Sequence, residues 1–73
     1  MTTEQFRAML HQQPFRAFTI RMADGRAFDV GHRDFVAMSP TGLTVIVYQD
    51  NDSFSVLDLL LMSELQVANG HHA

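Results

Sequence analysis

The sequence predicts a mainly β fold with one short N-terminal helix, which is α+β by content. Apolar and polar residues alternate with a period of two along most of the chain, and clusters of turn residues separate the alternating stretches. Only residues 3–12 show helical spacing instead. We therefore expect about five strands in one strongly bent antiparallel sheet, with the helix packed against it.

The helix is predicted over residues 3–12. Thr2 and Gln5 have the spacing of a capping box, and Pro14 ends the helical pattern. An apolar stripe follows the cap at helical spacing, formed by Phe6, Met9 and Leu10. Because a helix this short is not stable alone in water, we expect the stripe to dock on the sheet.

Residues 15–30 predict the hairpin around which the chain is organised. A three-residue loop, 23–25, with Gly25 in a left-handed bulge keeps the apolar residues of both strands on one face, whereas a two-residue loop does not. On the outer face, Arg21 and Asp29 are expected to meet diagonally. The expected cross-strand pairs are Ile20 with Phe28 and Phe18 with Val30.

A second hairpin is predicted after a loop or bend at residues 31–34, where Gly31 is free to adopt positive φ. Residues 35–38 form its first strand, and residues 39–42 form a turn with proline and glycine at favourable positions. Residues 43–48 are apolar on both faces, which predicts a central strand covered by the first hairpin on one side and by the helix on the other.

The remaining elements alternate between turns and strands. Residues 49–53 are a polar turn, and residues 54–57 resume an extended pattern. The leucine run at 58–62 predicts a single helical turn with Asp58 near its N-terminus, because residues 63–67 then alternate as a last strand.

Length and composition indicate one small domain. The chain has 73 residues and no cysteine, which excludes a disulfide scaffold and a thiolate zinc site. No secretory segment or membrane-spanning run is present, so we expect a cytoplasmic protein without membrane contact. Residues 68–73 are expected to fray, and His71 and His72 resemble a cloning remnant.

The charge is acidic and unevenly distributed. The formal net charge is −3, the opposite of what a general nucleic-acid binder requires. Residues 1–36 hold all five arginines and four carboxylates, hence +1, whereas residues 37–73 hold four carboxylates and no arginine or lysine, hence −4.

Two resemblances follow from this order of elements. Residues 1–67, with the segments QPFRAFTIRMADGRAFDV, DFVAMSPTGLTVIVY and DLLLMSELQV, resemble a group of short uncharacterised bacterial proteins with a PF-x-x-F-x-I-x-x-x-D-G-R pattern. More loosely, the order of elements resembles a small SH3-like or Sm-like open barrel. The turn 39–42 lacks the glycine and asparagine of Sm motifs, a departure that disfavours RNA binding and leaves the implied barrel in place.

Catalytic and metal-binding signals are weak. His32 and Asp34 are two positions apart, which would place an imidazole and a carboxylate on one side of an extended segment, but two ligands do not complete a site. Asp50 and Asp52 begin a calcium-loop pattern without its glycine and final glutamate. No nucleophile motif or phosphate loop is present, so we expect no enzyme activity, metal or cofactor.

The sequence therefore favours a non-enzymatic interaction or assembly module that self-associates. We expect the last strand to be an open sheet edge, with Gln66 pointing away from the core so that Gln66→Pro removes an edge donor. The edge residues are Leu61, Ser63, Leu65, Gln66 and Val67.

Two alternatives remain. The first is an Sm-like protein that binds RNA or DNA through arginines with aromatic neighbours, which the net charge disfavours. Its candidate contacts are Arg16, Arg21, Arg26 and Arg33. The second and less favoured alternative is a metal-dependent enzyme with its site between subunits.

Overall fold

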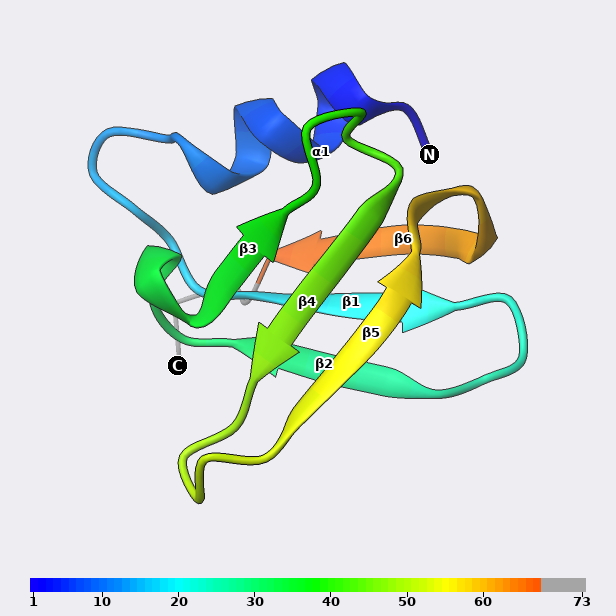
Figure 1. Cartoon of the computed structure of the whole chain (residues 1–73). Coiled ribbons are helices and arrows are strands. Elements are labelled where there is room, and N and C mark those ends of the chain that lie inside the picture. The colour runs from blue at the N-terminus through cyan, green and yellow to red at the C-terminus, as the bar shows by residue number, and fades with distance from the viewer. Residues whose placement is uncertain (68–73) are drawn as a thin grey trace, which may run out of the picture.

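The structure is a computed structural model that describes residues 1–67. It contains one helix and two three-stranded antiparallel sheets (Figure 1). Sheet A has the strand order β2-β1-β6, and sheet B has the order β3-β4-β5. The elements are α1 Thr3–Leu10, β1 Phe18–Met22, β2 Ala27–Val30, β3 Val36–Met38, β4 Thr44–Tyr48, β5 Phe54–Asp58 and β6 Met62–Val67. Residues 68–73, including the expected frayed tail and its two histidines, lie outside the described residues.

The mainly β class is confirmed, but the single bent sheet of about five strands is wrong. The described residues hold six strands in two sheets that do not close into a barrel, because no strand of sheet A pairs with a strand of sheet B. The chain passes from one sheet to the other at two short 3-10 turns. The first turn, Arg33–Phe35, interrupts the path between β2 and β3. Gly31 does not adopt positive φ, so the chain bends through the turn and not at the glycine.

The first hairpin has the expected register. Ile20 pairs with Phe28 and Phe18 with Val30. The Gly25 N–H donates to the Met22 carbonyl at 3.0 Å, and Gly25 has a φ of 95°, as a bulged three-residue loop requires. The spacing of apolar residues and one glycine therefore determined this register.

A carboxylate stabilises the turn of this hairpin. Asp24 accepts hydrogen bonds from the Arg26 backbone N–H at 3.0 Å and from Arg26 Nε at 2.9 Å. The backbone hydrogen bond is the main reason that the pKa of Asp24 lies below its usual value.

The expected diagonal pair on the outer face of this hairpin is wrong. Asp29 accepts a hydrogen bond from Thr19 Oγ1 at 2.8 Å, because the two residues face each other directly. Arg21 instead reaches across to β6, where its Nε donates to Gln66 Oε1 at 2.9 Å. The strand on the other side of β1, which the sequence does not place, attracts the arginine.

The helix α1 docks as predicted but is shorter. Both hydrogen bonds of the Thr2 and Gln5 capping box are present, and the helix ends at Leu10, before Pro14. Phe6 is fully buried, with its ring edge against Phe18 at a centroid distance of 6.0 Å. At the start of the helix, the Thr3 hydroxyl donates to the Gly42 carbonyl at 3.2 Å.

The core is one layer between the inner faces of the two sheets, closed by α1 (Figure 1). In β4 only one face is covered: Val45 and Val47 are fully buried, whereas Tyr48 is 40% exposed. The expectation that both faces of this strand are covered is therefore wrong, because α1 lies near the β3–β4 turn and not over the outer face of sheet B. The buried residues are Phe6, Leu10, Phe18, Ile20, Met22, Val30, Val45, Val47, Leu57, Leu59 and Met62.

The leucine run forms the predicted helical turn. A 3-10 turn spans Leu59–Leu61, and the Asp58 carboxylate at its N-terminus accepts a hydrogen bond from the Leu60 N–H at 2.9 Å. The turn points Leu59 into the core and leaves Leu60 and Leu61 outside, 65% and 55% exposed. Three consecutive leucines thus divide between the core and the surface.

We expect Gly25→Val to destabilise the fold by about 1–3 kcal/mol, because a β-branched residue is strained at positive φ. No atom lies within 4 Å of a Cβ built at Gly25, so the cost is conformational and not a clash. Gly31→Val is the matched control, since Gly31 has neither positive φ nor a neighbour within 4 Å. Thermal melts of both variants test this, and equal shifts would contradict the assigned turn.

We expect Leu57→Ala and Leu59→Ala each to lower the free energy of unfolding by about 2–5 kcal/mol, because both side chains are buried. Leu60→Ala and Leu61→Ala are controls of the same chemistry at exposed positions and should stay within about 0.5 kcal/mol of the parent. Urea unfolding of the four variants measures the difference. Four similar midpoints would show that the turn is oriented differently.

Candidate functional site

The histidine and carboxylate singled out in the sequence lie together, but their contact is local. His32 Nδ1 accepts a hydrogen bond from the Asp34 N–H at 3.2 Å and lies 3.6 Å from Asp34 Oδ2. The imidazole thereby caps the 3-10 turn Arg33–Phe35. Both side chains are exposed, and within residues 1–67 no three histidine or acidic side chains come close enough to hold a metal ion. The contact between His32 and Asp34 is therefore the cap of a turn.

One of the two aspartates of the polar turn has a structural role. Asp50 and Asp52 lie in the connection between β4 and β5, where the Asp52 N–H donates to the Gln49 carbonyl at 3.1 Å. Asp52 has a φ of 73°, which aspartate tolerates better than most residues. The geometry of the turn therefore explains Asp52, whereas Asp50 is exposed beside it.

Among the four candidate nucleic-acid contacts, Arg33 is the most strongly held. Its Nε donates to the Leu10 carbonyl at 3.0 Å and its Nη2 to the Gln12 carbonyl at 3.1 Å, so it satisfies the end of α1. Its guanidinium carbon also lies 5.8 Å from the centre of the Phe15 ring. This arginine has a structural role in the protomer.

The other candidate arginines lie on separate elements. Arg26 is in the first hairpin turn, paired with Asp24 at 2.9 Å and placed over the Phe28 ring. Arg21 is on β1 beside Gln66, and Arg16 is exposed in the segment before β1. Nucleic-acid contact by these side chains stays a prediction.

The last strand lies at the edge of sheet A, beside β1. The Met22 N–H donates to the Arg26 carbonyl, which shows that the backbone groups of Met22 point toward β2. Because these groups point to opposite sides at successive residues of a strand, the even residues of β1 bond to β2 and the odd residues bond to β6. Glu64 and Gln66 face odd residues of β1 and bond to them, which leaves the backbone groups of Leu65 and Val67 at the open edge.

The expectation that Gln66 contributes an outward donor is therefore wrong. The Gln66 side chain is exposed as predicted, but the backbone N–H of Gln66 faces β1. Gln66→Pro would therefore remove a hydrogen bond between β6 and β1 and leave the donors of the open edge in place. Whether the Gln66 N–H points toward β1 or toward the open edge depends on which residues of β1 bond to β2. The sequence of β6 does not contain that information.

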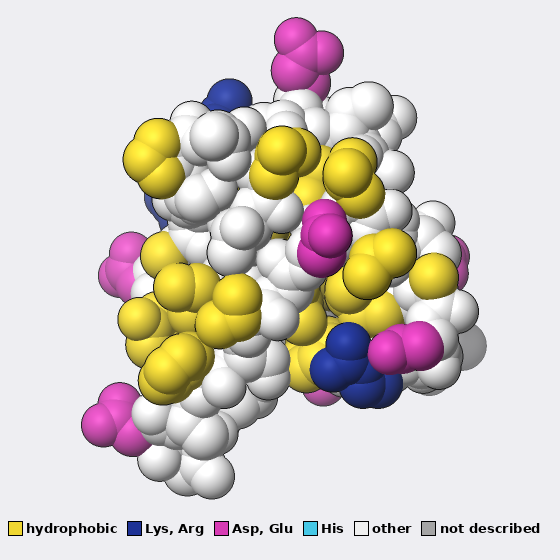
Figure 2. All heavy atoms as spheres, turned by 45° about the vertical axis from the view of Figure 1, so that its right-hand side comes forward, with side chains coloured by type: hydrophobic (Ala, Val, Ile, Leu, Met, Phe, Trp, Pro, Cys, Tyr) yellow, Lys and Arg dark blue, Asp and Glu magenta, His cyan; other side chains and the backbone are white. Residues whose placement is uncertain are grey.

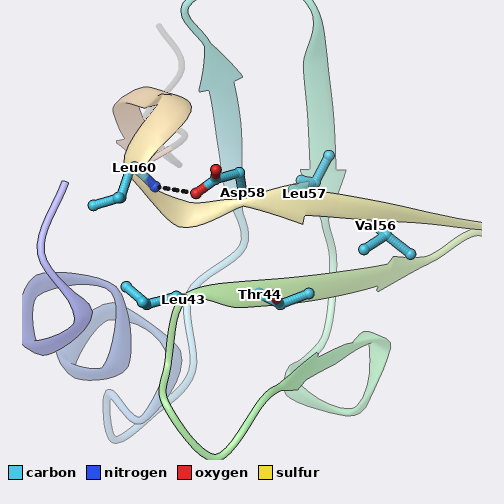
Figure 3. Close-up of a pocket in the computed structure, with 6 residues that line it drawn as sticks. All are labelled: Leu43, Thr44, Val56, Leu57, Asp58 and Leu60. Carbon is cyan, nitrogen blue, oxygen red and sulfur yellow. Dashed lines mark hydrogen bonds between the residues drawn. The ribbon is translucent and has the colours of Figure 1, made fainter.

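An open apolar pocket of about 350 Å³ lies where β4 and β5 approach the leucine turn (Figure 3). The hairpin register brings Leu43, the residue before β4, beside Leu60 of the turn, and the Asp58 carboxylate caps that turn at the rim. Thr44 and Asp58 are cross-strand partners in the pocket wall, and the other four lining side chains are apolar, so the pocket can hold an apolar side chain. It is lined by Leu43, Thr44, Val56, Leu57, Asp58 and Leu60.

Sequence reasoning missed this pocket. Leu43 and Leu60 are separated by the whole β4–β5 hairpin, and only the pairing of Thr44 with Asp58 brings them together. The signal that could have found it is the apolar surplus on the outward positions of β4 and β5, which a single core layer cannot bury.

No family model matches this chain, and neither the curated proteins nor the solved structures yield a match. Within the described residues, no helix is long and apolar enough to cross a membrane. The function must therefore be inferred from the geometry of the surfaces.

We expect Arg33→Ala to lower the free energy of unfolding by about 1–3 kcal/mol, because it leaves two partly buried carbonyl groups without their donors. Arg16→Ala is the matched control at an exposed position and should stay within about 0.5 kcal/mol of the parent. Urea unfolding measures both variants. Equal stability of the two would show that Arg33 does not hold the end of the helix.

Proposed function

We propose that this protein is a non-enzymatic interaction module that self-associates through the edge of β6. The observation that carries the proposal is the open edge of sheet A at Leu65 and Val67, which no lysine or proline protects. Leu61, at the start of this edge, is 55% exposed. A second strand would pair with the open backbone groups and cover these apolar side chains.

The small core supports the same proposal. A domain of this size buries only about 60% of the surface of its unfolded chain, so an added interface is a large gain in stability. A symmetric dimer is the commonest outcome of edge pairing, and a ring forms if the contact is head-to-tail.

We further propose that the two sheets form an open barrel of the SH3-like or Sm-like kind. The pairing of the first strand with the last supports this, because it joins the two ends of the strand series within sheet A. The crossing of β5 over β1 and β2 in Figure 1 is consistent with a small barrel left open between the sheets.

A protein partner fits the charges better than a nucleic acid does. Three of the four candidate arginines already contact groups of their own chain, and the net charge is −3. Backbone phosphates would have to displace these contacts and overcome the acidic field.

We expect Leu61→Lys to weaken self-association, because a charge at an open edge opposes pairing with a second strand. Leu60→Lys is the matched control: it adds the same charge one residue away, at a side chain that lines the pocket of sheet B. Both leucines are exposed, so neither variant empties the core. Sedimentation velocity over a concentration series measures the assembly.

Two results would contradict the proposal. The first is a parent protein that sediments as an 8.3 kDa monomer at every concentration. The second is an equal loss of assembly in both lysine variants, which would place the contact elsewhere.

A further inference from the structure

A second open edge lies on sheet B, along β5. The Leu59 N–H donates to the Leu43 carbonyl at 2.9 Å, which fixes the alternation of the β4–β5 ladder. Ser55 and Leu57 therefore bond to β4. The backbone groups of Phe54, Val56 and Asp58 point to the open side, where no other backbone group of the described residues bonds to them.

The side chains beside this edge form an apolar face. Val56 is 60% exposed and Phe54 59%, and the Phe54 ring lies 5.7 Å from that of Tyr48. The exposed surface of these three residues and of the pocket residues Leu43 and Leu60 amounts to roughly 500 Å². This area is at the upper end of the apolar patches that soluble monomers expose. Figure 2 shows apolar side chains gathered on this side of the molecule, with carboxylates among them.

Charge indicates what covers this face. Residues 37–67 contain Asp50, Asp52, Asp58 and Glu64 and no lysine or arginine. The turn that precedes β5 carries the first two of these carboxylates, and Asp58 ends the strand. Pairing of β5 with β5 of a second copy would bring like charges together, whereas a basic partner would complement both ends.

We propose that the edge of β5 binds an extended peptide segment of another protein as a fourth strand of sheet B. This proposal rests on the proposed role as an interaction module, but it uses a different surface from self-association. Main-chain hydrogen bonds to Phe54, Val56 and Asp58 supply the pairing, and the apolar face selects the side chains.

The geometry specifies the sequence of the segment. Side chains at alternate positions share the outer face, so two apolar residues two positions apart lie beside Phe54 and Val56, one of them at the pocket. Asp58 ends β5, and Asp52 lies in the turn just before the strand begins, so lysine or arginine fits near each end of the added segment. The heptapeptide KTVTVTK has this pattern in either direction.

The first experiment measures binding of fluorescein-labelled KTVTVTK to the parent protein by anisotropy. We expect it to bind at least about tenfold more tightly than ETVTVTE, which keeps the apolar residues and reverses the charges. Its affinity should fall as salt rises, because the carboxylates are exposed. Equal affinity of the two peptides, or no binding of KTVTVTK, would overturn the proposal.

The second experiment compares Val56→Pro with Val56→Thr. The proline removes the outward N–H without removing a bond to β4, and the threonine keeps the N–H and the side-chain shape. We expect Val56→Pro to lose peptide binding and Val56→Thr to keep it to within about threefold, with thermal melts showing whether each variant folds. Equal binding by the two folded variants would contradict strand addition.

Hydrogen exchange on the parent protein tests the same edge without a substitution. The amides of Phe54, Val56 and Asp58 should exchange fast in the free protein and slow in saturating KTVTVTK, while those of Ser55 and Leu57 stay slow throughout. Protection of Val56 before peptide is added would mean that a second copy already covers the edge, and would overturn the proposal.

The two functional proposals can fail independently. Leu61→Lys should leave peptide affinity unchanged to within about threefold while it weakens self-association. Val56→Pro should lose peptide binding while it leaves self-association unchanged. A loss of peptide binding in Leu61→Lys would contradict a separate site on β5.

Discussion

The single apolar layer between the two sheets is the constraint on which the rest of this structure depends. Ile20 of sheet A and Leu57 of sheet B meet in that layer, and Phe6 of the helix closes its end. A chain of 73 residues has enough apolar side chains for one such layer and not for two. Every strand must therefore present one face to the layer and leave the other uncovered.

The two 3-10 turns follow from this constraint. Strands that pack on both sides of one layer must be joined by segments that cross between the sheets, and the chain crosses at Arg33–Phe35 and Leu59–Leu61. A side chain caps each crossing: His32 the first and Asp58 the second. The polar residues that resemble parts of a chemical site thus hold the places where the chain leaves one sheet for the other.

The same constraint produces the surfaces from which function is inferred. Two sheets of three strands have open edges, and the chain has no lysine to protect them. At β6 the open backbone groups adjoin an exposed leucine, and at β5 they adjoin an apolar face with carboxylates at both ends. The one carboxylate of β6, Glu64, lies 3.8 Å from Arg21 Nε, so this edge suits a second copy. The carboxylates at the ends of β5 suit a basic partner, which separates the two proposed contacts.

The sequence by itself determined the features that depend on near neighbours along the chain. The period-two pattern and Gly25 gave the register of the first hairpin, and Asp58 before three leucines marked the helical turn. Only the tertiary structure decided that there are two sheets, that Arg21 bonds to Gln66, and that Val56 lies on an uncovered face. Periodicity says which residues share a face of a strand. It cannot say what packs against that face, because the neighbouring element comes from a distant part of the chain.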